Sequence, residues 1–149
     1  MAKPQLMTLG WREWVSLPDL GLPHIKAKVD TGARTSAIHA FALKTYDKDG
    51  HERVEFRMHP NQKDNNTIVV CDAAVVDKRV VTDSGGHREE RLVIETALQI
   101  GEHAWTIEAT LTSRDDMLFR MLLGRTAMKG RAIVNPGRSY LVGKPPKTE

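Results

Sequence analysis

The stretch IKAKVDTGARTSAIHA, residues 25–40, contains the segment that most strongly constrains the fold of this chain. In its first half, apolar residues alternate with Lys26 and Lys28, which is the pattern of a β-strand with one buried face. The strand runs into Asp30-Thr31-Gly32, where an acid, a small hydroxyl residue and a glycine form a tight turn. Because glycine has no side chain, backbone N–H groups can approach the acid closely. The stretch therefore predicts a strand whose end presents a carboxylate.

Most of the remaining chain also has the pattern of short strands separated by turns. The predicted strands are residues 54–58, 67–76, 91–100, 103–112, 131–134 and 139–142. Gly101-Glu102 predicts a two-residue hairpin turn, and Asp47-Lys48-Asp49-Gly50 predicts another hairpin turn. One short helix is expected at residues 125–129, before Gly130. This pattern predicts an all-β fold, a closed barrel with one short helix.

Composition indicates an ordinary globular chain and excludes several classes of protein. The 149 residues fit one domain, expected at residues 1–143, followed by a disordered tail at residues 144–149. The net charge of +3 is too small to predict nucleic-acid binding but is compatible with an acidic partner. The single cysteine, Cys71, cannot form an intramolecular disulfide and is expected to be buried and inert. Without a signal-like or membrane-spanning apolar run, the cytoplasm is the expected location.

Taken alone, Asp30-Thr31-Gly32 is also what a simple strand-ending turn looks like. A second motif favours a functional interpretation. Downstream, Met121-Leu122-Leu123-Gly124-Arg125 is an apolar strand that runs into Gly-Arg and then into the predicted short helix. Together, in this order, the two motifs resemble the sequence frame of retropepsins, over residues 25–128.

The similarity extends to a bacterial family of small retropepsin-like aspartic peptidases, often labelled "ATP-dependent zinc protease". The stretches that carry it are GWREWVSLP at residues 10–18, residues 25–40, and MLLGR at residues 121–125. In this frame residues 82–88 take the place of the flap, and residues 41–75 form an inserted hairpin and strand. The resemblance implies a peptidase in which Asp30, Thr31 and Gly32 form the catalytic turn.

The same resemblance implies a homodimer. Chemistry of this type needs two carboxylates that share a proton and hold a water molecule, and the chain contains one suitable motif. Asp83-Ser84-Gly85 lies at the expected flap and does not fit as the second. A second subunit, related by two-fold symmetry, is therefore expected to supply the missing acid.

One position departs from the viral pattern and suggests the substrate. Those enzymes follow Asp-Thr-Gly-Ala with a second aspartate that pairs with the arginine of Gly-Arg, whereas this chain has Arg34. A basic residue beside the cleft predicts acidic substrate side chains, because arginine binds carboxylates in a bidentate manner. The expected substrate-binding residues are Ala33, Arg34, Ser84, Gly85, Gly86, Arg88 and Arg125, with Lys28 as an additional cation. The alternative is that Arg34 is a solvated surface charge.

Members of this family occur beside a ligase that adds glutamates to the C-terminus of a ribosomal protein. The resemblance therefore implies a glutamate-rich or glutamylated ribosomal-protein tail as substrate, and the ligase as a partner. Two other interpretations stay open. One is a non-catalytic peptide-binding or assembly domain, and the other is the zinc-dependent peptidase of the label.

The sequence contains neither a zinc-binding motif nor an ATP-binding motif to match that label. The chain has no HExxH, no closely spaced metal-binding pair among its six histidines, and no phosphate-binding loop with a Lys-Ser or Lys-Thr pair. No cofactor and no metal is therefore expected, and His39 is expected to be packed or hydrogen-bonded. Trp11, Trp14 and Trp105 are expected to pack in the core or a dimer interface, with Arg12 and Glu13 on the wet side of a strand.

Overall fold

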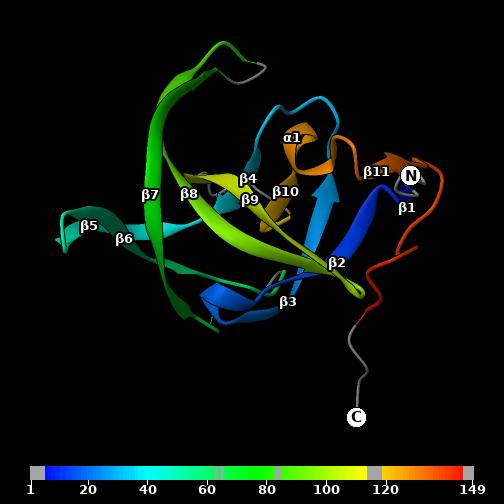
Figure 1. Cartoon of the computed structure of the whole chain (residues 1–149), viewed down its shortest axis with the longest axis horizontal. Helices are drawn as coiled ribbons and strands as arrows, with labels where there is room; N and C mark the ends of the chain where they lie inside the picture. The colour runs from blue at the N-terminus through cyan, green and yellow to red at the C-terminus, as the bar shows by residue number, and fades with distance from the viewer. Residues whose placement is uncertain (1–5, 63, 65, 83–84, 114–118, 146–149) are drawn as a thin grey trace, which may run out of the picture.

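The alternation of apolar and polar residues produces strands over most of the chain, as predicted. The computed structural model describes residues 6–62, 64, 66–82, 85–113 and 119–145 (Figure 1). Its strands are β1 (Met7–Leu9), β2 (Arg12–Leu17), β3 (Leu22–Val29), β4 (Ser36–His39), β5 (Phe41–Lys48), β6 (His51–Met58), β7 (Val69–Thr82), β8 (Arg88–Ile100), β9 (His103–Thr112), β10 (Met121–Leu123) and β11 (Ala132–Val134). A 3-10 turn, η1 (Pro18–Leu20), and a short helix, α1 (Arg125–Met128), are the described helical elements. The predicted all-β class with one short helix is confirmed.

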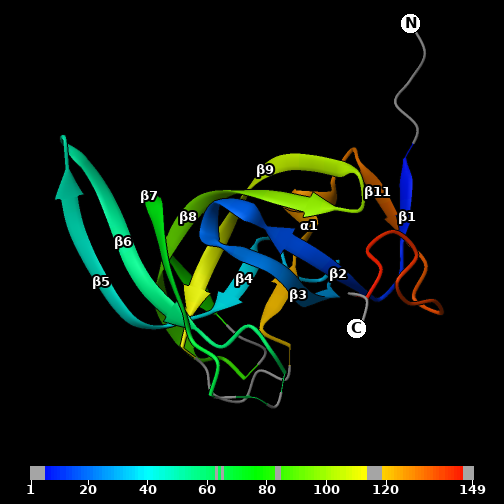
Figure 2. The same ribbon diagram turned by 90° about the horizontal axis from the view of Figure 1, so that it is seen from below.

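Nine strands form one sheet in the order β2-β3-β10-β4-β9-β8-β7-β6-β5, and β1 and β11 form a separate parallel pair. The large sheet curls, so that β2 also pairs with β8 where Ser16 lies opposite Gln99. The β5–β6 hairpin projects from the rest of the molecule (Figure 2). A fully closed barrel goes beyond this single pairing and stays a prediction.

The core forms between the inward faces of the curled sheet. In β3 the predicted alternation is confirmed, since Ile25, Ala27 and Val29 are buried and Lys28 is exposed. Cys71 is buried as expected, and burial raises the pKa of its thiol to about 12. None of the described helices has the length and hydropathy of a membrane span.

Both predicted hairpin turns are present. Gly101 joins β8 to β9 with a φ of +59°, a conformation that residues with a side chain rarely adopt. Asp49 and Gly50 join β5 to β6 with φ values of +55° and +81°, as in a type I′ turn. Residues 41–75 thus form an added hairpin, β5–β6, and the first part of β7, as the sequence predicts.

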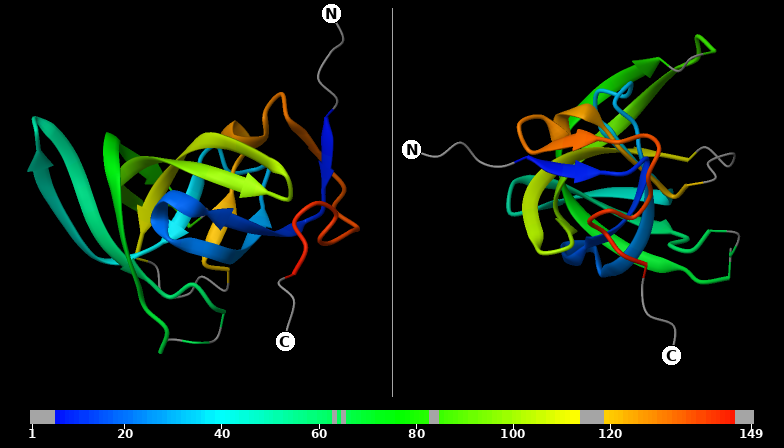
Figure 3. Two further views of the ribbon diagram at one scale, coloured as in Figure 1. Left: turned by 60° about the horizontal axis from the view of Figure 1, so that its bottom comes forward. Right: turned by 90° about the vertical axis from the view of Figure 1, so that its right-hand side faces the viewer.

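The predicted strand at residues 139–142 is wrong, because a buried carboxylate takes up the backbone N–H groups of this segment. Glu13 Oε2 accepts hydrogen bonds from the N–H groups of Gly10 (2.6 Å) and Leu141 (3.0 Å). Its Oε1 accepts from the N–H groups of Val142 (3.0 Å) and Gly143 (2.7 Å). The C-terminal segment, drawn in red, therefore loops back beside β1 and β2 instead of extending a ladder (Figure 3).

The placement of Glu13 on a wet face is also wrong, because its side chain is fully buried. The tryptophans of this region are only half-buried. Arg12 lies over the ring of Trp11 at 4.7 Å, and Lys26 lies over the ring of Trp14 at 5.5 Å. In β2, therefore, the acid lies inside, and cationic side chains lie over the half-buried aromatic rings.

We expect Glu13→Gln to lower the free energy of unfolding by about 3 kcal/mol, because an amide nitrogen would face two buried N–H donors and leave them without an acceptor. Urea denaturation monitored by tryptophan fluorescence measures the change. Glu102→Gln, in the exposed β8–β9 turn, is the matched control and should change stability by less than about 0.5 kcal/mol. Equal effects of the two substitutions would contradict a structural role of the buried carboxylate.

Candidate active site

The turn after β3 holds the Asp30 carboxylate in one orientation. The backbone N–H of Gly32 donates to Asp30 Oδ1 at 2.9 Å, and the N–H of Ala33 donates to the Asp30 carbonyl at 3.3 Å. A Cβ on Gly32 would lie 3.2 Å from the same Oδ1, closer than most side chains pack. Asp30 is half-buried, while Thr31 and Gly32 are exposed. The turn therefore presents its acid group at the surface, as predicted.

The two motifs of the sequence meet at this turn. β10 lies between β3, which it pairs with in parallel, and β4, which it pairs with antiparallel. The N–H of Asp30 donates to the Leu123 carbonyl at 2.9 Å, and the N–H of Arg125 donates to the Ala33 carbonyl at 2.8 Å. The end of β10 and the first residue of α1 thus fix the acid-bearing turn at its two ends.

Gly124 allows the chain after β10 to approach the Asp30 turn closely. A Cβ at Gly124 would lie 2.5 Å from the carbonyl carbon of Thr35 and 2.7 Å from the backbone nitrogen of Ser36. Its own N–H donates to Ser36 Oγ at 3.0 Å, a bond between buried groups. Any residue with a side chain would therefore push β10 away from the loop that carries Asp30.

Arg125 binds the turn itself. Its guanidinium donates to the Thr31 carbonyl at 2.9 Å, in place of the acidic partner that Arg34 removes from the viral pattern. Arg34 is exposed, and within the described ranges no ion pair includes it. His39 is buried, as expected for a packed side chain.

A hollow of about 390 Å³ separates the Asp30 turn from the β7–β8 hairpin. The hairpin curves over the loop between β3 and β4 (Figure 1). The turn contributes Gly32, Ala33, Arg34 and Thr35 to the lining, and the hairpin contributes Arg79, Val80, Val81, Thr82 and Arg91. The placement of a hairpin over the acid agrees with the predicted flap.

The hairpin residues that line the hollow differ from the substrate-binding residues predicted from the sequence. Gly85, Gly86 and Arg88 are exposed and do not line it, and Ser84 lies outside the described residues. Arg79 and Arg91 take their place. A hairpin centred on residues 82–88 places residues 79 and 91 opposite one another, as the observed register does. The expected hairpin register could therefore have predicted that Arg79 and Arg91 lie opposite one another.

Acidic neighbours neutralise these two arginines. Arg79 binds Asp77 at 2.8 Å and Glu108 at 3.0 Å, and these hydrogen bonds, first that to Asp77, raise its pKa. Arg91 binds Glu89 at 3.1 Å. Opposed arginines on adjacent strands would otherwise repel each other. In the hollow, Arg34 is thus the arginine that no described carboxylate neutralises.

A larger hollow, of about 840 Å³, lies beside the same turn and is called the α1 groove below. It is lined by Thr31, Arg34, Arg125, Thr126, Met128, Lys129, Ala132, Ile133, Val134 and Pro136. Arg34 lines both this groove and the hollow under the hairpin. The acid-bearing turn therefore separates two hollows, and Arg34 faces each of them.

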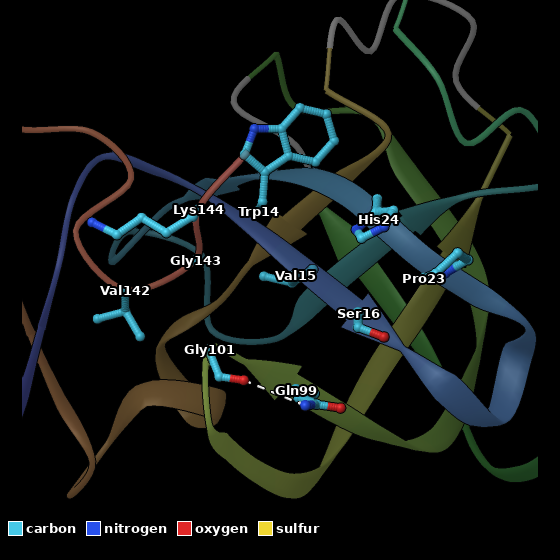
Figure 4. A pocket seen from close by; sticks show the side chains of 10 residues that line it. All are labelled: Trp14, Val15, Ser16, Pro23, His24, Gln99, Gly101, Val142, Gly143 and Lys144. Atoms are coloured by element: carbon cyan, nitrogen blue, oxygen red, sulfur yellow. Dashed lines mark hydrogen bonds between the residues drawn. The ribbon is translucent and has the colours of Figure 1, made fainter. Parts of the chain in front are cut away.

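A further hollow near β2 has a different character. Trp14, Ser16, His24 and Lys144 are among its lining residues (Figure 4). In that view the Trp14 ring and the Lys144 side chain point away from one another, so the polar groups do not converge. His24 lies near the start of β3 and Asp30 follows its end, a separation of about 20 Å along the strand. This hollow is therefore not part of the Asp30 site.

A zinc site needs several metal-binding side chains close together. Within residues 6–62, 64, 66–82, 85–113 and 119–145, no three side chains of the metal-binding types His, Cys, Asp and Glu form a group that could hold a metal ion.

The comparison with known families agrees with the geometry. The family model described as "RimB-like: Retropepsin-like aspartic endopeptidase RimB" matches residues 8–145. The chain belongs to this RimB-like family. The match includes both the Asp30 turn and the Gly124-Arg125 motif.

Similar proteins include longer chains with another name. A probable alpha-L-glutamate ligase of Desulfotalea psychrophila is 48% identical over 136 residues, which is 91% of this chain and 29% of that protein. Proteins of the same name are 45% identical over 136 residues in Shewanella halifaxensis and 46% over 135 residues in Parasynechococcus marenigrum. Each of these two alignments includes 91% of this chain. They include 30% of the Shewanella protein and 29% of the Parasynechococcus protein. This RimB-like chain thus spans less than a third of these relatives.

A solved structure has the same fold. It is the crystal structure of Lpg0085 from Legionella pneumophila, a protein described as having unknown function. It aligns with a TM-score of 0.78 and 25% sequence identity, over 92% of this chain and 98% of that one. A crystal structure therefore shows nearly the whole fold of this RimB-like chain.

Gly124→Ala should lower the free energy of unfolding of this RimB-like chain by about 3 kcal/mol, since the added methyl group collides with the backbone of Thr35 and Ser36. Thermal and urea denaturation measure the loss. Gly137→Ala is the control, because a Cβ there meets its nearest atom at an ordinary 3.5 Å. A Gly124→Ala protein as stable as the control would show that β10 does not need this close approach.

Proposed function

We propose that this chain is an aspartic peptidase in which the Asp30 residues of two copies form the catalytic pair. The observation that carries the proposal is the Asp30 turn, whose carboxylate accepts a hydrogen bond from Gly32 and whose ends are bound by β10 and by the first residue of α1. Membership of the RimB-like family of retropepsin-like endopeptidases supports it. The proposed roles are Asp30 as acid and base, with Thr31 and Gly32 as the residues that position it.

The chemistry requires two carboxylates with one shared proton and a water molecule between them. The ionised carboxylate removes a proton from the water as its oxygen attacks the peptide carbonyl carbon. The protonated carboxyl donates its proton toward the carbonyl oxygen. When the tetrahedral intermediate collapses, the C–N bond breaks and a proton passes to the amine nitrogen. The Gly32 N–H keeps the Asp30 carboxylate oriented through these steps.

The proposed source of the second carboxylate is another copy of the chain. The arginines of the hairpin that line the hollow, Arg79 and Arg91, are ion-paired with Asp77, Glu108 and Glu89. An acid held by an arginine is a poor acceptor for the water proton, because the cation stabilises its charged form. A two-fold homodimer, with Asp30 next to its symmetry copy, provides the missing group.

The proposed substrate is a peptide with acidic side chains. Arg34 faces the hollow next to Asp30 and has no described carboxylate partner, so a substrate glutamate can bind it in a bidentate manner. Relatives with a segment like this chain are named probable alpha-L-glutamate ligases, which supports a glutamate chain as the material handled. The proposal also names a glutamylated ribosomal-protein tail as the substrate and the ligase as a partner, both in the cytoplasm.

The ligase name of the relatives also supports a second candidate function. In a longer ligase, a domain of this kind could hold the glutamate chain without cutting it. The α1 groove and Arg34 would then bind peptide, and Asp30 would have no catalytic role. Cleavage by the purified chain decides between the two functions.

Asp30→Asn should reduce cleavage of a glutamate-rich peptide by about a thousandfold or more, because an amide pair cannot share and transfer the proton. Mass spectrometry of the peptide after incubation measures the products. Asp19→Asn, an exposed acid in η1, is the control and should cleave normally. Chelators should leave cleavage unchanged. A protein that cuts nothing, whose Asp30→Asn variant binds the peptide equally well, would favour the binding domain.

Arg34→Gln should lower kcat/KM for a glutamate-rich peptide by about tenfold, the effect of one lost charge-assisted hydrogen bond to a carboxylate. The matched peptide with glutamine at every glutamate position should be cut at an unchanged rate. Arg57→Gln, an exposed arginine in β6, is the control. If Arg34→Gln cut both peptides as the parent protein does, Arg34 would be a solvated surface charge.

A further inference from the structure

The α1 groove contains three uncompensated cations. Arg34, Arg125 and Lys129 line it, and no acidic residue does. All three side chains are exposed, and across the described part of the chain no ion pair includes any of them. The arginines deeper under the hairpin differ, because each is bound by a carboxylate.

Five apolar residues and two threonines, Thr31 and Thr126, form the rest of the groove. Met128, Ala132, Ile133, Val134 and Pro136 lie along it, and Ile133 is 54% exposed. An exposed apolar surface with a charged rim is typical of a protein–protein interface. The composition of the groove is therefore that of a contact surface whose charges have no partner.

The proposed catalytic pair places this groove at the two-fold axis. Two Asp30 carboxylates that share a proton lie on either side of the axis, and Thr31, the next residue, lines the groove. Arg125 is bound to the Thr31 carbonyl at 2.9 Å, so its charge lies close to the same axis. In such a pair the Thr31 end of each α1 groove lies beside the other chain, whose Asp30 completes the site.

The charges oppose this contact. Each cation of one groove meets three like charges in the other, while a catalytic pair that shares a proton contributes a single negative charge. An acidic peptide in the cleft removes the imbalance, because its carboxylates bind arginine and lysine directly. Salt reduces the repulsion too, since charges further apart than about 8 Å are largely screened at physiological ionic strength.

We infer that two copies of this chain meet over their α1 grooves and that an acidic peptide is an integral part of that interface, binding Arg34, Arg125 and Lys129 and thereby promoting dimerisation. The inference rests on the proposed function, since it takes the Asp30 pair as the position of the axis. It adds that the substrate assembles the enzyme: the active site forms where an acidic chain is present.

Sedimentation velocity of the full chain tests this, with a hexaglutamate peptide as the probe. The wild-type chain and the Asp30→Asn chain, which leaves the probe intact, are measured in parallel. Hexaglutamate should lower the dimer dissociation constant by about tenfold or more at low salt, and a matched glutamine peptide should not. Raising the salt from about 0.05 to 0.5 M without peptide should also strengthen the dimer, by screening.

Paired variants locate the effect. Arg34→Gln combined with Lys129→Gln should dimerise more tightly than wild type without peptide and should respond less to hexaglutamate. Lys44→Gln combined with Lys48→Gln, in the projecting β5–β6 hairpin, removes the same charge and should behave like wild type. A dissociation constant that hexaglutamate does not change, or an equal response of the two double variants, overturns the inference.

Peptide cleavage, measured on the same samples, separates this inference from the proposed function. A wild-type chain that cuts glutamate-rich peptides while its dimerisation ignores hexaglutamate overturns the anion-dependent interface and leaves the peptidase. A chain that hexaglutamate drives into dimers but that cuts nothing supports the interface and overturns the peptidase.

Discussion

The passage of β10 between β3 and β4 is the constraint on which the site depends. It brings Leu123 and Arg125 to the two ends of the Asp30 turn, where their backbone groups hydrogen-bond to that turn. The passage has no room for a side chain at Gly124, where a Cβ would lie 2.5 Å from the Thr35 backbone. A catalytic acid has to be held within a few tenths of an ångström, and short backbone bonds between packed strands can do this.

A second long-range contact joins β2 to the C-terminal segment. The Glu13 carboxylate, fully buried, binds four backbone N–H groups, three of them in the C-terminal segment. A buried charge is tolerated when hydrogen bonds replace its lost hydration, as they do here. The C-terminal segment is thereby tied to β2 of its own chain. The α1 groove and the Asp30 turn remain at the surface, where another molecule can reach them.

Charge is distributed unevenly around the site. Under the β7–β8 hairpin, Arg79 and Arg91 are neutralised by acids of the same chain, so they stabilise the hairpin arms. Next to the Asp30 turn, Arg34 and Arg125 have no described acid partner, although Arg125 binds a carbonyl. The difference separates cations that serve the fold from cations that remain available to a ligand.

The sequence alone determined the features that arise from neighbours along the chain. Strand β3, the Asp30 turn, the hairpin turns at Gly50 and Gly101 and the helix after Gly124 follow from local alternation and backbone conformation, and each could be predicted. Only the tertiary structure decided that Glu13 is buried and that residues 139–142 form no strand. These depend on groups as far apart as residues 13 and 143, whose contact requires the folded sheet. Local patterns carry no information on which distant donor will meet a given acceptor.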